Sequence, residues 1–413
     1  MEKHNAKFDL TWLKKDQLQE ILTALSKDGH ETRIVGGAVR NAMLNIAPTD
    51  IDLATTCSTD DITAYLASYN IKILPTGIAH GTLTLIAANE KFEITRLRKD
   101  IKTDGRHASV SFDANWQEDA QRRDFTINAL YLDKDGNLYD YVNAIQDLET
   151  HTVRFIGDAA QRIQEDYLRI LRFFRFYAYY GTGSPNRAAI LNCTIYKTGL
   201  KKISAERIWA ELKNILSAPD PSRALLWMRQ SGVLEIILIE SKKWGIDSIH
   251  NLIKAEQHFN WPTKNNYLLR LEAIIPKNLD TIEMIAKRLK LSNKEKYRLK
   301  AWAQLTNIED KTPIKKLLYE NPRIAIVDNL KLLIAKNFQK PTILNYYVSL
   351  LAQSLNDPIP IFPIQANDLM ELKQLQGPAI GNALEQLKET WLNNDCTATK
   401  EELLAKFVKL DQL

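Results

Sequence analysis

A pair of glycines followed by an arginine forms the part of this sequence with the most evident chemistry. The run at residues 34–40, IVGGAVR, predicts a strand that passes through a Gly–Gly turn into a helix. Such a turn exposes backbone N–H groups to a phosphate, and the guanidinium of Arg40, in the first turn of the helix, can bind two phosphate oxygens. The glycine pair and Arg40 are therefore candidate phosphate-binding groups.

Two aspartates follow ten residues after this arginine. Asp50 and Asp52 lie two residues apart on a predicted strand, so both carboxylates point to one face. Neighbouring carboxylates repel each other unless a cation lies between them, and Mg²⁺ prefers such oxygen ligands together with substrate phosphates. Glu93, on a strand of the next predicted hairpin, is a candidate third carboxylate. This set suits nucleotidyl transfer with two metal ions roughly 3.5–4 Å apart, one activating a hydroxyl and one stabilising pyrophosphate.

Two adjacent arginines and an asparagine form a second candidate group. A Gly–Gly turn or an Asp-x-Asp strand end is common in proteins and usually has no catalytic role, so the first two motifs need support from other residues. In the run at residues 122–130, RRDFTINAL, Arg122 and Arg123 can clamp a triphosphate, and Asn128 can reach a ribose hydroxyl. The alternative is a helix start with a surface Arg–Asp pair.

An acid and a base spaced for one helix face form the third group. Asp166 and Arg169 are three residues apart in EDYLRILRFFRF, residues 165–176, and are expected to be neighbours on a helix. An acceptor fixed beside a donor matches the Watson–Crick edges of cytosine and adenine and rejects those of uracil and guanine, because a mismatch leaves buried polar groups unpaired. Arg172 and Arg175 continue the row. The alternative is a surface salt bridge on an amphipathic helix, with the phenylalanines in the core.

These groups require a sheet to carry the carboxylates and helices to carry the arginines. Before residue 157, short β-rich runs alternate with turns and short helices, which predicts a small mixed sheet in an α+β domain. The expected strands are residues 51–54, 82–87, 91–97, 137–141 and 152–156. After residue 157, apolar residues recur at helical spacing. The clearest predicted helices are residues 168–180, 205–216, 222–228, 281–291, 324–334 and 342–355.

Composition excludes several classes of protein. At roughly 100–200 residues per domain, 413 residues predict two to four domains. A hydrophobic fraction of 45% and a charged fraction of 25% exclude a disordered or collagenous chain, and no apolar run is long enough for a membrane span. Three scattered cysteines and the absence of metal-type histidine pairs favour a cytoplasmic protein and a metal site of oxygen ligands. The net charge of +5 permits an anionic partner.

Together the motifs resemble the class II tRNA nucleotidyltransferase and bacterial poly(A) polymerase family. The motifs follow the family's order over about half the chain: IVGGAVRN, DIDLAT, RRDFTINAL, EDYLRILRFFRF and ISAERI with Glu211. The resemblance implies a nucleotidyltransferase head at residues 1–157, a helical neck with the nucleobase-reading helix at 158–218, and a helical body and tail at 219–413. It also implies addition of C, C and A to the 3′ end of tRNA with CTP and ATP, without a nucleic-acid template.

The resemblance assigns roles to individual residues. It implies nucleotide phosphate contacts for Gly37, Arg40 and Arg123, and metal ligation by Asp50 and Asp52 with Glu93 as third carboxylate. It further implies base reading by Asp166 and Arg169. Further nucleotide contacts would come from Arg172 and Arg175. The implied cofactor is Mg²⁺, and the implied partner is tRNA, bound through its acceptor and T arms by shape and phosphates.

The chain departs from the family pattern at three places. Asn41 stands where an aspartate usually follows GGAVR, Asn45 where glycine is frequent, and Asn143-Ala144 where a glycine pair follows a strand. None of these changes removes an expected ligand. The last one puts in doubt a hinge associated with the step from C to A addition. The polar segment 98–108, which contains a glycine, is expected to be the flexible loop that the family associates with that same step.

Other functions remain open at this point. A poly(A) polymerase has the same head and neck, although the mixed charge of residues 404–413 mildly favours CCA addition. A partial, CC- or A-adding enzyme is also compatible with the sequence, and a non-catalytic RNA-binding protein of the same fold is the more remote alternative. The oligomeric state is not predicted.

Overall fold

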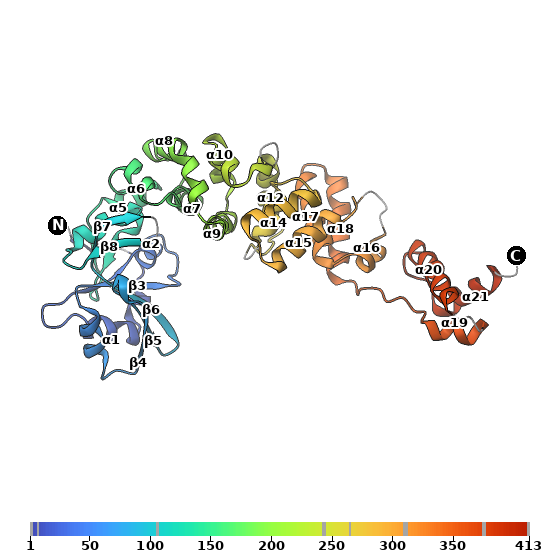
Figure 1. Ribbon diagram of the computed structural model, residues 1–413, viewed down its shortest axis with the longest axis horizontal. Coiled ribbons are helices and arrows are strands. Elements are labelled where there is room, and N and C mark those ends of the chain that lie inside the picture. Colours follow the sequence, from blue (N-terminus) through green and yellow to red (C-terminus); the bar gives the residue numbers. More distant parts are fainter. Residues whose placement is uncertain are drawn as a thin grey trace. The chain divides into compact units, whose positions relative to one another are not determined.

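The computed structural model describes residues 3–5, 8–104, 107–241, 245–263, 266–308, 313–373 and 377–410. The chain forms two compact units, Met1–Ile237 and Leu238–Leu413. The first unit carries the sheet and the second is helical throughout its described residues (Figure 1). The predicted division at residues 157 and 218 is finer than this one and stays a prediction.

The first unit is built on one eight-stranded mixed sheet with the order β1-β10-β9-β2-β3-β6-β5-β4. Its one parallel pair is β3 with β6, and the other neighbours are antiparallel. The expected small mixed sheet is therefore confirmed. The strands are β1 (Lys3–Asn5), β2 (Thr32–Val35), β3 (Ile51–Thr55), β4 (Ile71–Gly77), β5 (Thr82–Ala87), β6 (Glu90–Arg96), β9 (Leu130–Leu132) and β10 (Asn137–Asp140).

Two expectations about strands and loops are wrong. The segment 152–156 is a connector that makes only an isolated bridge between Phe125 and Phe155. Its apolar side chains pack instead against aromatic rings, with the centroid of Phe155 4.8 Å from that of Phe125 and 5.9 Å from that of Phe173. The expected loop after residue 98 forms a separate two-stranded hairpin, β7 (Lys99–Asp104) with β8 (His107–Ser111). Residues 105–106 of this segment lie outside the described residues.

Helices alternate with the strands of the first unit and continue along the chain after the last strand. Helix α3 begins with a reciprocal capping box formed by Ser58 and Asp61. The helices are α1 (Asp16–Ala24), α2 (Gly37–Met43), α3 (Thr59–Leu66), α4 (Trp116–Gln121), α5 (Ala144–Glu149), α6 (Ala159–Glu165), α7 (Arg169–Tyr180), α8 (Arg187–Tyr196), α9 (Ala205–Leu216), α10 (Ser222–Gln230) and α11 (Val233–Ile237), with the 3₁₀ turns η1 (Thr11–Lys14), η2 (Ile78–His80), η3 (Thr126–Asn128) and η4 (Lys197–Lys202).

Helix α7 connects the sheet region to the helices that follow. Its apolar residues recur at three- and four-residue spacing, so that Phe173, Phe174 and Phe176 are buried together, as predicted for core residues. Helix α7 packs on α9 and α10. The opposite face is left to carry the arginines Arg172 and Arg175.

The second unit consists of helices, as predicted. No helix among the described residues is both long and apolar enough to cross a membrane. One of its apolar clusters is centred on Trp391, which lies edge to face against Tyr319 and Phe362. The helices are α12 (Ile246–His258), α13 (Tyr267–Glu272), α14 (Leu279–Leu289), α15 (Asn293–Gln304), α16 (Ile314–Glu320), α17 (Arg323–Lys336), α18 (Pro341–Asn356), α19 (Ala366–Lys373), α20 (Pro378–Asn393) and α21 (Lys400–Leu410), with the 3₁₀ turn η5 (Ile239–Ser241).

Candidate functional site

The glycine turn joins β2 to α2 in a conformation that requires glycine. Gly36 has φ 75° and ψ −119° and forms the N-cap of α2, and its N–H donates to the Leu130 carbonyl at 3.1 Å. A side chain there would be strained whatever the space around it, since L residues rarely adopt this backbone conformation. Gly37 follows in the helix, and a Cβ added to it would lie 3.6 Å from Arg40 Nη2. The turn thus brings backbone N–H groups beside the Arg40 side chain.

The acidic residues meet where β3 lies parallel to β6. Asp52 is in direct register with Glu93, and Asp50 immediately precedes β3. The pKa of Asp52 is raised, mainly by burial and then by the negative charges of Glu93 and Asp50. Lys91 donates to Glu93 at 2.7 Å. The Asp52 site therefore has an excess of negative charge.

This excess of negative charge fits a divalent cation. No cluster of three or more His, Cys, Asp or Glu side chains able to hold a metal is found within the described ranges. The protein thus offers a close carboxylate pair, Asp52 with Glu93, and Asp50 nearby. Such an incomplete set is typical of Mg²⁺ sites that take their remaining oxygens from substrate phosphates and water.

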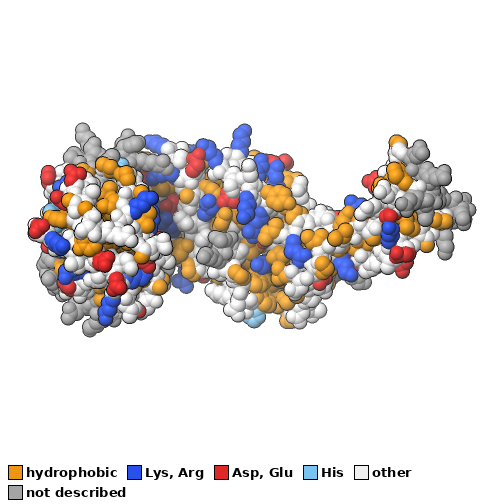
Figure 2. Space-filling view, turned by 90° about the horizontal axis from the view of Figure 1, so that it is seen from below, with side chains coloured by type: hydrophobic (Ala, Val, Ile, Leu, Met, Phe, Trp, Pro, Cys, Tyr) orange, Lys and Arg blue, Asp and Glu red, His pale blue; other side chains and the backbone are white. Residues whose placement is uncertain are grey.

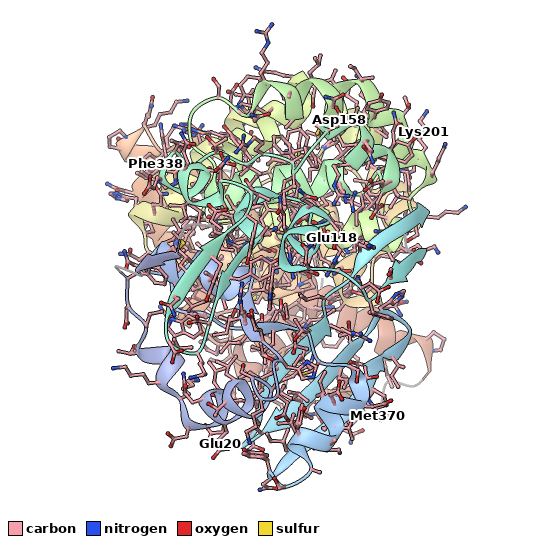
Figure 3. All side chains as sticks on the ribbon, turned by 90° about the vertical axis from the view of Figure 1, so that its left-hand side faces the viewer. Glu20, Glu118, Asp158, Lys201, Phe338 and Met370 are labelled. Atoms are coloured by element: carbon pink, nitrogen blue, oxygen red, sulfur yellow. The ribbon has the colours of Figure 1, made fainter. Side chains whose placement is uncertain are left out.

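Arg123 is held by a buried acid that the sequence reasoning missed. Asp119, on α4 next to the residue Glu118 labelled in Figure 3, is only 1% exposed. Its Oδ1 accepts from Arg122 at 2.6 and 2.9 Å, and its Oδ2 accepts from Arg123 at 3.0 and 3.2 Å. The Tyr131 hydroxyl donates to the same carboxylate at 2.8 Å. The two arginines therefore diverge from one anchor, and only Arg123 lines the cavity described below.

Arg40 is fixed by three neighbours rather than left to solvent. It is 7% exposed and donates to the Oδ1 of Asn128, to the Oδ1 of Asn41 at 3.1 and 3.2 Å, and to the Tyr180 hydroxyl at 2.7 Å. That hydroxyl in turn donates to the Asn41 Oδ1 at 3.2 Å. The guanidinium also lies 4.1 Å from the centroid of the Tyr180 ring. Helix α7 thus orients an arginine of α2.

Asp124 joins Asn128, the partner of Arg40, to Arg172 of α7. Asn128 donates to the Oδ1 of Asp124 at 3.1 Å, and Arg172 donates to its Oδ2 at 2.5 and 2.7 Å. Burial would raise the pKa of Asp124, but Arg172 and Asn128 outweigh it and lower the pKa to about 2. Arg175 donates to Glu211 of α9 at 3.2 Å. Asn128 therefore links Arg40 to Asp124 in this structure, so its predicted contact with a ribose stays a prediction.

Most of the predicted nucleotide-binding residues line one cavity of about 460 Å³, a size within the range of small-molecule sites. Phe176, Tyr179 and Tyr180 form an aromatic wall in it, and Asn214 of α9 also lines it. The predicted residues that line it are Gly37, Arg40, Asp52, Arg123, Asn128, Arg172 and Arg175. Asp50 and Glu93 lie beside Asp52, outside this lining.

The predicted base-reading pair is arranged differently from expectation. Asp166 is not on the helix with Arg169, because α6 ends at Glu165 and Asp166 caps it, while α7 begins only at Arg169. The Asp166 carboxylate accepts from Arg207 of α9 at 2.7 and 3.3 Å, and Arg169 forms an ion pair with Glu165. Both predicted residues are thus engaged elsewhere, and neither lines the cavity. Arg207 lies 41 residues from Asp166, so helical spacing gave no signal for it.

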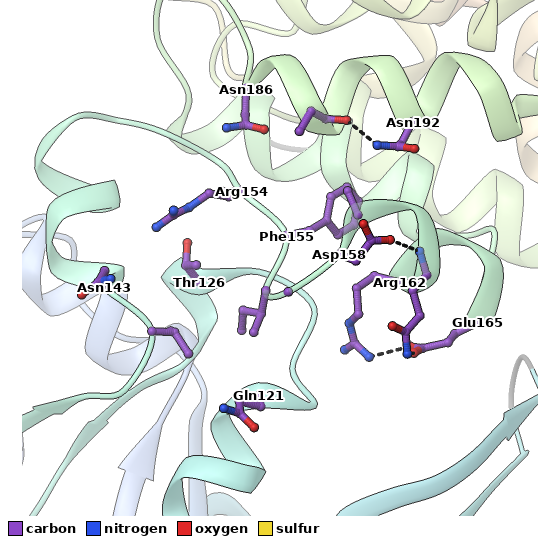
Figure 4. Close-up of a pocket in the computed structure, with 16 residues that line it drawn as sticks. Gln121, Thr126, Asn143, Arg154, Phe155, Asp158, Arg162, Glu165, Asn186 and Asn192 are labelled. Atoms are coloured by element: carbon purple, nitrogen blue, oxygen red, sulfur yellow. Dashed lines mark hydrogen bonds and ion pairs between the residues drawn. The ribbon is translucent and has the colours of Figure 1, made fainter.

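A second cavity of about 650 Å³ in the same unit holds none of the predicted site residues. Figure 4 shows Thr126, Asn143 and Arg154 on one side of it and Asn186 and Asn192 of the α8 region on the other. Asn143 has φ 61°, the left-handed conformation that glycine adopts freely. Asn45 has φ 56°. Both positions noted above for replacing glycine therefore use the residue type that best tolerates this conformation after glycine.

Comparisons with known proteins show which family the chain resembles. A family model described as "Poly A polymerase head domain" matches residues 32–154, and another, "Probable RNA and SrmB- binding site of polymerase A", matches residues 192–243. The "CCA tRNA nucleotidyltransferase 1, mitochondrial" of Mus musculus is 34% identical over 412 residues, covering 95% of this chain and 90% of that protein. The "CCA-adding enzyme" of Streptococcus sanguinis is 37% identical over 228 residues, covering 54% of this chain and 55% of that protein.

Solved structures share the fold. The Bacillus stearothermophilus CCA-adding enzyme in complex with CTP aligns with a TM-score of 0.70 at 22% identity, covering 96% of this chain and 98% of that one. The Thermotoga maritima CCA-adding enzyme complexed with tRNA aligns with a TM-score of 0.65 at 19% identity, covering 95% and 94%. From its motifs and from the full-length relative at 34% identity, the chain belongs to the class II tRNA nucleotidyltransferase and bacterial poly(A) polymerase family.

Proposed function

We propose that this protein adds C, C and A to the 3′ end of tRNA, using CTP and ATP without a nucleic-acid template. The observation that carries the proposal is the convergence of the glycine turn, Asp52 and four arginines on one cavity. A triphosphate needs several fixed cations, and a polymerising site needs carboxylates at the same place. The full-length relatives named for this activity support the same conclusion.

The residues of the cavity divide the work. The N–H groups of the glycine turn and the guanidinium groups of Arg40 and Arg123 bind the triphosphate and hold its leaving group. Asp119 keeps Arg123 in place, so that the cation does not need to reorganise during the reaction. The aromatic side chains of Phe176 and Tyr179 offer flat surfaces against which a nucleobase can stack.

Asp50, Asp52 and Glu93 are the residues that would hold divalent cations, with Mg²⁺ as the proposed ion. When bound, such ions would lower the pKa of the attacking 3′ hydroxyl and stabilise the departing pyrophosphate. The raised pKa of Asp52 means that this carboxylate takes up protons more readily before a cation arrives. Addition should therefore weaken as the pH falls toward that pKa, and chelation of divalent ions should stop it.

Base choice is assigned to Asp166 and Arg169 by the resemblance, and that assignment is a proposal. Their present partners, Arg207 and Glu165, hold each side chain at a defined place before a nucleotide is bound. An edge-reading role requires the two side chains to turn from these partners toward the base. Arg207 is then the residue that competes with the base for the Asp166 carboxylate.

The tRNA is proposed to bind through its acceptor and T arms. Figure 2 shows Lys and Arg side chains along the face that it draws, interleaved with apolar ones. Part of the positive charge of helices α14 and α15 is neutralised within the unit, since Glu283 pairs with Lys296 and Lys300. Lys287 and Lys294 are exposed and are candidates for phosphate contacts.

A cytoplasmic location stays a prediction, as several of the relatives are named as mitochondrial.

The product can be established directly. The protein is incubated with tRNA that ends at the discriminator base, tRNA that ends in CC, and an unrelated RNA, with CTP and ATP supplied singly and together. CCA addition predicts two C on the first substrate, one A on the second and no product on the third. Long A tracts on the unrelated RNA would instead establish the second candidate, a poly(A) polymerase, which the head-domain match also allows.

A further inference from the structure

The second unit contains a cavity of about 300 Å³ that is far along the chain from the site described above. Helices α12, α15 and α17 and the segment after α13 contribute to its lining. Ala273, Ile275, Leu332 and Ala335 give it an apolar wall. Its volume is at the lower end of the range of small-molecule sites. The cavity is thus large enough for a small metabolite, and its apolar wall faces a lining that also includes Asp247, Ser248, Asn251 and Lys336.

Three of the polar side chains that line the cavity have buried polar atoms without a partner among the described residues. Both carboxylate oxygens of Glu272, the Nζ of Lys277 and the Nε1 of Trp302 are buried and have no hydrogen-bond partner among the described residues. Glu272 is 2% exposed and Trp302 is 3% exposed. A buried polar group without a partner costs on the order of 1–3 kcal/mol, and more for a charge. Three such costs in one place indicate that something outside the chain satisfies them.

No neighbouring charged side chain that the structure describes pairs with Glu272 or Lys277. The positive charge of Arg298 acts on Glu272, but Arg298 forms a two-point ion pair with Asp328 at 2.7 and 2.8 Å. Burial, and then the charge of Asp328, raises the pKa of Glu272, while burial lowers the pKa of Lys277. Although Glu272 and Lys277 interact electrostatically, no ion pair within 4 Å joins these two described side chains. An acid and an amine therefore line one cavity, each without an opposite charge in contact.

We propose that this cavity binds a small zwitterion of amino-acid size. The ammonium group of the ligand pairs with Glu272, its carboxylate accepts from Lys277 and from the indole N–H of Trp302, and its side chain lies against the apolar wall. A zwitterion satisfies all three groups at once and leaves no charge unpaired. A nucleobase, the other candidate occupant in an RNA-modifying enzyme, carries no charge and would leave both Glu272 and Lys277 uncompensated.

Binding by the full-length protein tests this inference, with thermal denaturation and calorimetry as readouts. The probes are the twenty L-amino acids, supplied one at a time, together with cytidine and adenosine. For any amino acid that raises the melting temperature, its N-acetyl and its amide derivatives are tested as well, because each lacks one of the two charges. We expect at least one amino acid to stabilise the protein and both of its derivatives to bind at least about tenfold more weakly.

The variants Glu272→Gln and Lys277→Met test the two charged contacts separately. Each should weaken amino-acid binding at least about tenfold. Lys277→Met should leave the ligand-free protein as stable as before or more stable, because it replaces a buried amine without a partner by an apolar side chain. Glu272→Gln should leave it about as stable as before, because it keeps the shape of the side chain and removes its capacity for negative charge. Lys406→Met, the same substitution at an exposed position of this unit, should change neither quantity.

Three results would overturn the inference. They are no stabilisation by any of the twenty amino acids, stabilisation by a nucleoside instead, and amino-acid binding that survives both variants. Lys277→Met alone decides the matter if Glu272→Gln does not fold. Nucleotide addition is not a readout in these measurements, so the outcome is independent of the proposed function.

Discussion

At the scale of single residues, the site is defined by how each charged group is held. Arg40 and Arg123 both come from helix ends beside the cavity, but one is fixed by neutral oxygens and the other by a buried carboxylate. An Arg held by Asn and Tyr keeps its full charge for a phosphate, whereas an adjacent Asp would neutralise part of that charge. This gives a physical meaning to Asn41, which stands where the family usually has an aspartate.

Asp52→Ala should abolish nucleotide addition and leave tRNA binding nearly intact. The change removes the carboxylate that lies opposite Glu93, so a divalent cation loses a ligand and the rate should fall about a thousandfold or more. Single-turnover incorporation of CMP and a filter-binding assay with tRNA measure the two effects. Asp135→Ala, at an exposed turn, is the matched control. Loss of tRNA binding with retained addition would contradict the metal-binding role.

Tyr180→Phe should raise the KM for CTP and ATP about tenfold with a smaller effect on kcat. The variant keeps the ring beside Arg40 but loses the hydroxyl that joins Arg40 to Asn41, and a hydrogen bond to a charged group contributes about 1.5–3 kcal/mol. Steady-state kinetics with each nucleotide measure the change. Tyr196→Phe on α8 serves as the control. Equal KM values for the wild type and Tyr180→Phe would show that Arg40 does not depend on this contact.

At the scale of elements, helix α7 does the most to assemble the site. One of its faces is packed in the core, and the other reaches both the sheet region and α9. Arg172 binds Asp124 beside η3, Arg175 binds Glu211 of α9, and Tyr180 at the last turn binds Arg40 of α2. Helix α7 is thus bonded to the segment beside η3, to α9 and to α2, and these contacts fix three of the arginines that line the cavity.

Stability between about pH 4 and pH 2 should depend on the bond between α7 and Asp124. The native pKa of Asp124 is about 2, against about 3.9 in an unfolded chain. The stabilisation is complete above the unfolded value and is lost as the pH falls through the native value, an effect of about 2–3 kcal/mol. Urea unfolding at several pH values measures it. Asp124→Asn should flatten this part of the pH profile, and an unchanged profile would contradict the assignment.

Asp166→Ala should relax base choice and allow UTP or GTP to be incorporated. The carboxylate lies between α6 and α7 and is the acceptor of the proposed reading pair, so its loss removes the discrimination against bases with a carbonyl in place of the amino group. Product sequencing with each nucleotide supplied alone measures this. Asp158→Ala, which removes the cap at the other end of α6, controls for loosening of that helix. If incorporation stays confined to C and A, Asp166 does not read the base.

Much of the fold and part of the site followed from local patterns. Helical periodicity located α7, α9 and α17 to within two residues, and alternation located the β5–β6 hairpin. The residue types that line the cavity were also predictable, since glycine turns and arginines have local signatures. The partners of these residues were not: Asp119 for Arg123, Arg207 for Asp166 and Tyr180 for Arg40 are set by packing between elements. Spacing within one helix suggested an Asp166–Arg169 pair, but the break between α6 and α7 separated them.

At the scale of the whole molecule, each of the two units holds its own set of charged side chains in or beside a cavity. The first unit gathers cations around one cavity, and the second neutralises several of its lysines internally and encloses Glu272 and Lys277. A protein with a net charge of only +5 therefore binds an anionic partner through placed charges rather than through bulk attraction.

Binding of tRNA should weaken steadily as salt is added. Each phosphate contact made by a Lys or Arg releases counterions, so the logarithm of the affinity falls linearly with the logarithm of the salt concentration. Lys287→Ala and Lys294→Ala should each make this slope shallower, while Lys296→Ala, whose charge is paired with Glu283, should change it less. Filter binding over a salt series measures the slopes. If all three variants have the same slope as the wild type, these lysines of α14 and α15 do not contact the tRNA.

The single parallel pairing in the sheet has a consequence for biosynthesis. Because β3 and β6 run in the same direction, the chain must leave β3, pass through α3, β4 and β5, and return before Glu93 can stand opposite Asp52. Such a non-local pairing forms slowly compared with a hairpin, and it requires the whole of residues 51–96. During translation, Asp52 and Glu93 therefore cannot come together until the ribosome has released residues 51–96. A nascent chain that ends before Glu93 lacks this carboxylate pair and should not bind divalent ions there.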